Sequence, residues 1–233
     1  MHMIPTLLSI TTGIYICAAL YHLCFAARKI NTGLHLTFGM MCVMAAGYSL
    51  SEQAVYSSSS IPSFVYALKW QLSFGIVFMT GATWFTVFFT NNSSRLTVWL
   101  FGVAAIGLLA RNLFSPYGII VDKIHRFERL HLPWDEQIAF PSTDLAGWTV
   151  LLWLFSLLVY LFVLYGSRRL WAEGRRRAAM VLAANVLFFL IAGVVDLAID
   201  LRKLRWVYVA EFRFLLCIVS MAVYSTRHFS RKS

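Results

Sequence analysis

The chain has 233 residues, of which 60% are hydrophobic, 16% aromatic and only 13% charged. Together with a mean hydropathy of +0.71, this composition excludes a soluble globular domain, in which charged residues make up about a quarter of the chain. The net charge of +10 raises the question of a nucleic-acid partner, and the placement of the charges along the chain answers it.

Seven segments are apolar for long enough to cross a bilayer, which takes about 20 mostly apolar residues. They cover residues 5–27, 34–56, 62–90, 96–113, 147–165, 178–200 and 206–224. We therefore expect an all-α, polytopic membrane protein, with a seven-transmembrane-helix bundle in residues 1–225. Residues 226–233 then form a short basic segment that leaves the bundle.

One set of alternate loops carries the whole excess of positive charge. Its basic residues are Arg28, Lys29, Arg95, Arg168, Arg169, Arg175, Arg176, Arg177, Arg227, Arg231 and Lys232, and its acidic residue is Glu173. Cytoplasmic loops of membrane proteins are enriched in Lys and Arg. The pattern predicts the N-terminus outside and the C-terminus in the cytoplasm. The basic loops then contact anionic lipid headgroups and not nucleic acid.

The long connection at residues 114–146 falls on the outer side in this topology. Its short, apolar-alternating runs are broken by Pro133, a pattern that indicates a small β-hairpin or an irregular loop over the outer end of the bundle. Such a structure serves either as a lid over a pocket or simply as a packed loop, and the sequence leaves both open.

Nine polar or charged residues in or beside the predicted spans are candidates for ligand binding or signal transmission. They are Glu52, Lys69, Gln71, Arg111, Asp196, Asp200, Tyr208, Glu211 and Arg213. A charged group in a membrane helix costs about 2.5 kcal/mol or more, so it is rarely there without a partner or a function. In the predicted topology all nine lie in the outer third of the membrane.

The spacing of the charges predicts contacts between helices. Asp196 and Asp200 lie one helical turn apart on one face, whereas Glu211 and Arg213 point to nearly opposite sides of the last helix. Glu211 or Arg213 must therefore find an opposite charge on a neighbouring helix. The cluster indicates either a pocket for a small-molecule or lipid-like ligand, or interhelical salt bridges and interfacial groups that fix helix register.

The histidines do not predict a metal or cofactor site. His22 and His35 lie near the inner face, where hydrogen bonding is a simpler role than haem ligation, which needs paired axial ligands at matching depth. His125, Glu128 and His131 lie in the outer loop without the tight spacing of metal ligands. We expect no metal and no cofactor.

Two further classes of protein are disfavoured by the sequence. A retinal photoreceptor needs a lysine in its last helix, and residues 206–224 contain none. The short, basic cytoplasmic loops offer no phosphate-binding glycine loop and no catalytic carboxylate pair. We expect no enzymatic activity in this segment alone.

Five short stretches, in this order, carry a family resemblance over essentially the whole chain. They are LYH at 20–22, ALKWQ at 67–71, LPWDEQI at 132–138, DLAIDL at 196–201 and YVAEF at 208–212. With them the chain resembles the N-terminal seven-transmembrane input domain of bacterial sensor histidine kinases and related PAS- or GGDEF-containing sensors. It departs from the family pattern at Asp135, where we would expect glycine, and at Arg213, where the residue is usually uncharged.

The resemblance implies a sensor in the bacterial inner (plasma) membrane, in which a cue shifts the bundle and a cytoplasmic output domain detects the shift. Residues 226–233 are then the basic cytoplasmic exit toward this output domain, which is missing or absent. The chain is then an excised input domain or a stand-alone relative, with lipids, the output domain and a second copy of itself as candidate partners. The last helix is the expected transmitter. The alternative is a small proton- or ion-coupled transporter or channel, which the clustering of the acids at one depth disfavours.

Overall fold

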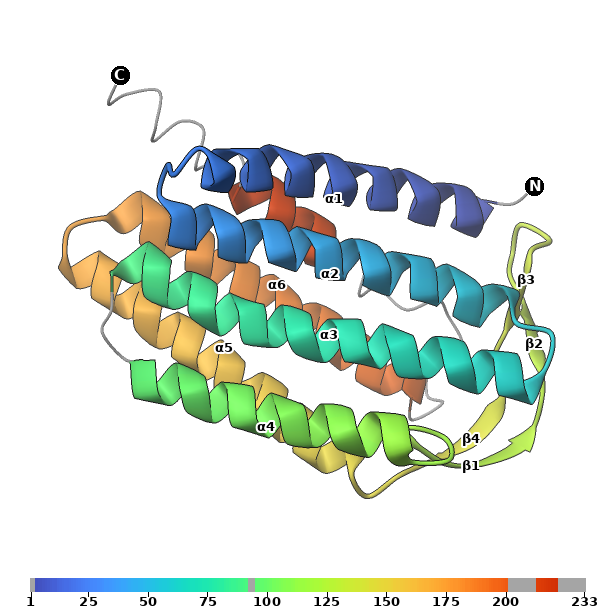
Figure 1. Ribbon diagram of the computed structural model, residues 1–233. Coiled ribbons are helices and arrows are strands. Elements are labelled where there is room, and N and C mark those ends of the chain that lie inside the picture. The colour runs from blue at the N-terminus through green and yellow to red at the C-terminus, as the bar shows by residue number, and fades with distance from the viewer. Residues whose placement is uncertain (1–2, 92–94, 201–212, 222–233) are drawn as a thin grey trace.

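The computed structural model describes residues 3–91, 95–200 and 213–221, apart from the side chains of Arg95 and Asp200 (Figure 1). Its helices are α1 (Met3–Ala27), α2 (Thr32–Ser57), α3 (Ile61–Thr90), α4 (Arg95–Phe114), α5 (Thr149–Ala172) and α6 (Arg176–Asp200). Residues 213–221 are also helical and are called the 213–221 helix below. All six numbered helices are long and apolar enough to cross a membrane, which indicates a multi-pass membrane protein.

The helix boundaries differ from expectation most clearly in α5. The sequence predicted an end at residue 165, where the apolar run stops, but the helix continues to Ala172. The added turns are held by α6, because Ser167 Oγ donates a hydrogen bond to the Ala179 carbonyl at 2.8 Å and Leu170 is fully buried. The predicted seventh span, 206–224, lies partly outside the described residues.

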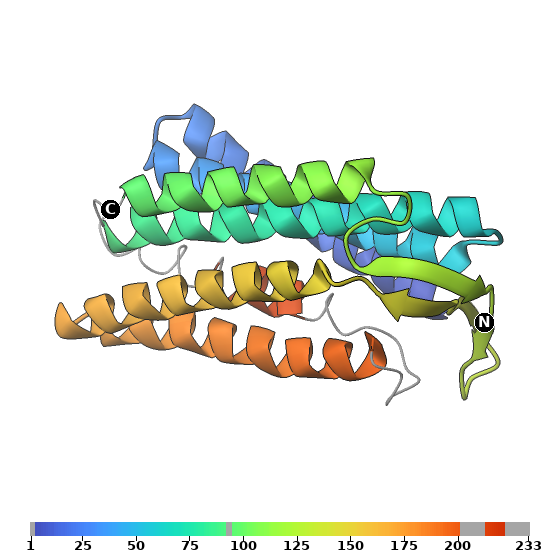
Figure 2. The ribbon, with the colours of Figure 1, turned by 90° about the horizontal axis from the view of Figure 1, so that it is seen from below.

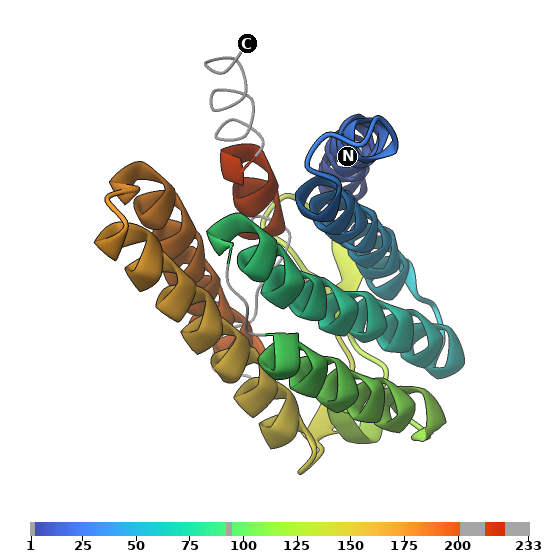
Figure 3. The same cartoon turned by 60° about the vertical axis from the view of Figure 1, so that its left-hand side comes forward.

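Helix α3 occupies the centre of the bundle, with α2, α4 and α5 packed against it, while α1 covers α2 and α6 pairs with α5. The 213–221 helix lies among α2, α3 and α6 (Figure 3), where Phe214 packs against Tyr48, Phe78 and Phe189. Helices α3 and α5 approach closely at Gly166, where a Cβ atom would lie only 2.6 Å from the Thr86 methyl group.

The connection between α4 and α5 forms two nested antiparallel strand pairs, called the cap below. Strand β1 (Val121–Arg126) pairs with β4 (Ser142–Leu145), and β2 (Arg129–His131) pairs with β3 (Gln137–Ala139). The cap covers one end of the bundle, which we call the cap end (Figures 1 and 2).

Buried hydrogen bonds attach the cap to the helices on two sides. The Glu136 carboxylate accepts from the backbone N–H of Ile4 at 3.1 Å and from Trp134 Nε1 at 2.9 Å. Asn112 is fully buried; its side-chain amide donates to the Lys69 carbonyl at 2.8 Å and accepts from the Ile119 N–H at 3.2 Å. Because buried polar groups are costly to leave unsatisfied, these bonds fix the position of the cap.

Candidate ligand cavity

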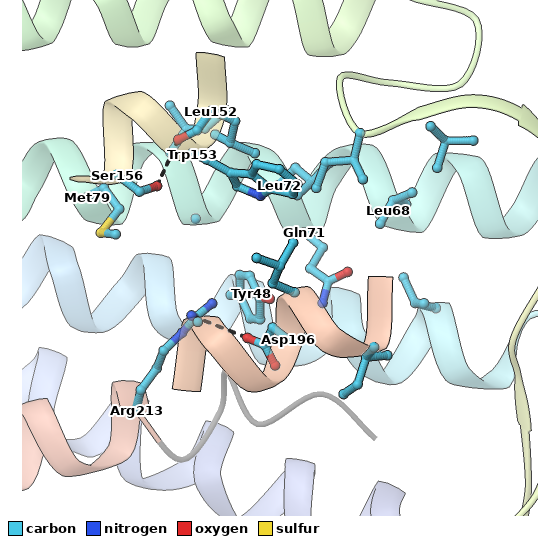
Figure 4. Close-up of a pocket in the computed structure, with 18 of the residues that line it drawn as sticks. Tyr48, Leu68, Gln71, Leu72, Met79, Leu152, Trp153, Ser156, Asp196 and Arg213 are labelled. Atoms are coloured by element: carbon cyan, nitrogen blue, oxygen red, sulfur yellow. Dashed lines mark hydrogen bonds and ion pairs between the residues drawn. The ribbon is translucent and has the colours of Figure 1, made fainter. Parts of the chain in front are cut away.

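A cavity of about 470 Å³ lies in the cap end of the bundle. Side chains of α2, α3, α5 and α6, the cap and the start of the 213–221 helix line it (Figure 4). This volume falls within the range of about 300–1,000 Å³ that is typical of small-molecule sites.

The walls of the cavity are mostly apolar. Leu68, Leu72 and Met79 contribute from α3, and Leu152 and Trp153 face them from α5 (Figure 4). Along α3 the lining residues Phe64, Leu68, Leu72, Gly75 and Met79 recur at three- and four-residue intervals, so this helix presents one face to the cavity. A ligand in the cavity would therefore be apolar over most of its surface.

The charged group in the cavity wall is an ion pair between two helices. Arg213 Nη1 lies 3.3 Å from Asp196 Oδ2, and the two side chains are only 17% and 13% exposed. The guanidinium also lies over the rings of Phe189 and Phe214, at 5.7 and 5.6 Å from their centroids. The expectation that Arg213 finds an opposite charge on a neighbouring helix is confirmed.

Two more of the predicted residues lie close to this pair. Gln71 is buried and lines the cavity between the ion pair and the cap. Glu52 is almost fully buried behind the wall and accepts a hydrogen bond from the Tyr56 hydroxyl at 2.8 Å. Arg213 interacts electrostatically with Glu52 as well as with Asp196.

Lys69 and Arg111 do not line the cavity. Lys69 Nζ donates to the Leu113 carbonyl at 3.2 Å, near the C-terminus of α4. The Arg111 guanidinium lies 4.9 Å from the ring centroid of Trp148. The sequence placed Lys69 and Arg111 at the same depth as the other candidates and so predicted that they share one site. The structure does not bring these two residues to the cavity, because each contacts a partner at a helix end.

The remaining predicted site residues are not described by the structure. Tyr208 and Glu211 lie outside the described residues, as does the side chain of Asp200, whose backbone ends α6. The structure in turn adds lining residues that the sequence did not indicate, such as Tyr48 of α2 and Ser156 and Tyr160 of α5. These side chains are uncharged and lie within apolar runs, so nothing in the sequence marked them.

The histidines form contacts away from the cavity. His22 and His35 are both buried, with their Nδ1 atoms 2.8 Å apart, and so join α1 to α2. His125 pairs with Asp144 across the β1–β4 pair at 2.8 Å. Among the described residues, no group of three His, Cys, Asp or Glu side chains has a metal-binding arrangement.

Comparison with known proteins does not assign the chain to a family. No family model matches it, and no curated protein shows significant sequence similarity to it.

Proposed function

We propose that this chain is the ligand- or membrane-cue-sensing input module of a bacterial inner-membrane signalling protein, such as a histidine kinase. The observation that carries the proposal is the Asp196–Arg213 ion pair, which connects a ligand-sized cavity to the 213–221 helix. In the topology predicted from the basic loops, the cavity lies in the outer half of the membrane, and this helix leads toward the cytoplasm.

The 213–221 helix is well placed to transmit a change in the cavity. Phe214, Ile218 and Met221 are buried along its length, so a movement of this helix would have to displace its neighbours. A second polar contact joins it to α6, where Asn185 Nδ2 and the Ser220 hydroxyl lie 2.9 Å apart. A shift of the helix by one turn would break both links to α6, which favours two discrete positions over a continuous slide.

A ligand would bias these positions through its contacts with the ion pair. Ligand binding shifts a conformational equilibrium only by its preference for one state. A molecule that contacts Arg213 and Asp196 in one helix position and not in the other has that preference. The cap contributes Ala139, Phe140 and Pro141 to the cavity lining, which supports a role as a lid.

The transporter alternative requires a polar path from the cavity to the opposite end. On the side of Arg213 away from the cap, the rings of Phe78, Phe189 and Phe214 pack together. The smaller cavity of about 50 Å³ beyond them is lined mostly by apolar side chains, and its polar lining residues among those described are Thr86, Tyr160, Asn185 and Cys217. This aromatic layer favours a sensor over an ion pathway.

The proposal is tested by attaching a histidine-kinase output domain after Ser233 and measuring phosphorylation in membranes. Asp196→Asn and Arg213→Asp should each shift basal activity several-fold at unchanged membrane levels, because each removes one partner of the ion pair. The exchanged pair Asp196→Arg/Arg213→Asp should restore part of the original activity. Glu173→Gln, which removes the exposed Arg169–Glu173 ion pair, is the control. Unchanged output in both single variants would refute the proposal.

The proposed orientation is tested separately by cysteine labelling after the four native cysteines are replaced. Lys123 in the cap and Arg168 near the end of α5 are both exposed. Lys123→Cys should react with a membrane-impermeant maleimide in intact cells, and Arg168→Cys only after permeabilisation. The reverse pattern would contradict the orientation.

A further inference from the structure

The cavity reaches the outside of the bundle between α5 and α6. Trp153 and Leu157 of α5 and Leu190 and Val194 of α6 line the cavity and are between 37% and 67% exposed. The two helices lie together at their connecting turn and diverge toward the cap end (Figures 1 and 2). In a helix of a membrane protein this surface faces lipid, so a molecule dissolved in the bilayer has direct access to the cavity.

The cavity is elongated along α3. Its lining on that helix extends from Phe64 to Met79, which corresponds to about 22 Å at the helical rise of 1.5 Å per residue. On α3 the lining is apolar apart from Gln71. Length and composition together fit an extended hydrocarbon chain better than a compact polar solute.

Among the described residues, those that line the cavity carry no net charge, and Glu52, which also interacts with Arg213, lies outside the lining. The charged lining residues are Asp196 and Arg213, and each neutralises the other. An anionic headgroup would meet Asp196 and a cationic one Arg213, so either would have to separate the buried pair, which is costly. An uncharged headgroup leaves the pair intact.

Arg213 still has a hydrogen-bond donor to offer. The side chain lines the cavity and is 17% exposed, and among the described residues its ion pair with Asp196 is made by Nη1. Guanidinium groups carry five N–H donors and no acceptor, and a buried donor without a partner is unfavourable. The matching ligand group is therefore an acceptor oxygen of a hydroxyl, ester or ketone.

From these observations we infer that the cavity binds a neutral, single-chain amphiphile taken up from the bilayer between α5 and α6. Its chain lies along the apolar face of α3, and an uncharged oxygen in its headgroup accepts a hydrogen bond from Arg213. This inference rests on the proposed sensing function and names the chemical class of the ligand.

The test uses the full chain in phosphatidylcholine vesicles and a monoacylglycerol that carries a photoreactive diazirine in its acyl chain. Mass spectrometry should place the adducts in residues 152–160 and 189–197. A tenfold excess of monooleoylglycerol should reduce this labelling at least fivefold, while the anion oleate and the cation oleylamine should have much smaller effects. Labelling that no competitor reduces, or that oleate reduces equally, would overturn the inference.

A matched pair of variants tests whether labelling comes from the cavity. A Cβ atom at Gly193 would have Arg213 Nη1, at 3.9 Å, as its one neighbour within 4 Å among the described residues, and one at Gly107 would have none. Gly193→Leu should fold, fill the cavity and abolish the competable labelling, whereas Gly107→Leu on α4 should leave it unchanged. Equal labelling of the two variants would contradict the assignment.

A third variant tests whether Arg213 contacts the headgroup of the ligand. Arg213→Lys keeps the positive charge beside Asp196 but replaces the planar set of guanidinium donors with a single ammonium group. The concentration of monooleoylglycerol needed for half-maximal competition should rise about three- to tenfold, the usual worth of one hydrogen bond. The effect of shortening the acyl chain should be unchanged. An unaltered competition curve would show that Arg213 does not contact the headgroup.

Failure of this inference and failure of the sensing function give different results. If Asp196→Asn changes the output of the kinase fusion but labelling is not competable, the sensor stands and the ligand class is wrong. If labelling is competable but neither saturating monooleoylglycerol nor Gly193→Leu changes kinase output, the site stands and the sensing function is wrong.

Discussion

Two helical hairpins of this protein, α1–α2 and α5–α6, have similar lengths but pack differently. Helices α1 and α2 stay in contact along their length, whereas α5 and α6 separate toward the cap end (Figure 1). Helices α5 and α6, which separate, are more apolar than α1 and α2. Apolar character therefore does not bring helices together here, as expected where the surrounding lipid is equally apolar.

Polar contacts and small residues account for the difference. In α1–α2 the hydroxyls of Thr11 and Ser49 lie 3.2 Å apart, and His22 pairs with His35 at 2.8 Å. Gly39 permits close approach of Leu23. In α5–α6 the corresponding contact, Ser167 with the Ala179 carbonyl, lies near the connecting turn. Toward the cap end, large side chains and the cavity replace such contacts.

The largest expected effect on stability comes from removing the ion pair that joins the α5–α6 hairpin to the 213–221 helix. Arg213→Leu should destabilise the protein by about 3–5 kcal/mol, because it leaves the Asp196 carboxylate buried without its charge partner. Thermal unfolding in detergent measures the loss. The double variant Asp196→Leu/Arg213→Leu should recover most of it. Equal stability of Arg213→Leu and the original chain would contradict a buried pair.

An intermediate effect is expected from adding the same side chain to each hairpin. A Cβ atom at Gly39 would lie 2.9 Å from Leu23 side-chain atoms, so Gly39→Leu should cost about 1–3 kcal/mol through overpacking. Gly193→Leu on α6 should cost much less, because it extends into the cavity. Thermal unfolding in one detergent compares the two variants, and similar losses would show that the hairpins are equally close-packed.

The hydrogen bonds that attach the cap to α1 should contribute to the free energy of unfolding by an amount comparable to, or smaller than, the cost of Gly39→Leu. Glu136→Ala leaves the Ile4 N–H and Trp134 Nε1 without their acceptor and should cost about 1–3 kcal/mol. Hydrogen exchange in the cap should accelerate, and Glu136→Gln, which keeps an acceptor oxygen, should have a weaker effect. Unchanged exchange in Glu136→Ala would mean that the cap is held by its apolar contacts alone.

The smallest effect is expected at the turn that joins α5 to α6. Arg169 and Glu173 form an ion pair of 3.0 Å, with both side chains 39% exposed. Exposed pairs at this helical spacing contribute about 0.3–0.5 kcal/mol. Glu173→Gln should therefore leave the unfolding temperature almost unchanged. A loss of more than about 1 kcal/mol in the free energy of unfolding would show that this turn holds α5 and α6 together.

The sequence by itself determined the six long helices and the need for a partner at Arg213. Hydrophobic runs of this length have few other stable forms, because backbone groups in a bilayer must be paired internally. Asp196 and Arg213 lie in the apolar interior, where each is the other's best available partner. Lys69 and Arg111 looked equally promising, but a long side chain near a helix end has several partners within reach. The predicted depth of Lys69 and Arg111 in the membrane therefore did not identify the partner that each side chain contacts.

Tertiary structure alone decided where the helices separate and what encloses the cavity. The contributions of Tyr48, Ser156 and Tyr160 depend on which face each helix turns toward α3, and an apolar run of residues does not specify that face when both neighbours and lipid are apolar. The burial of Glu136 depends on a contact with Ile4, 132 residues away. Periodicity constrains each helix separately, whereas the cavity arises from the angles between helices, which side-chain packing sets.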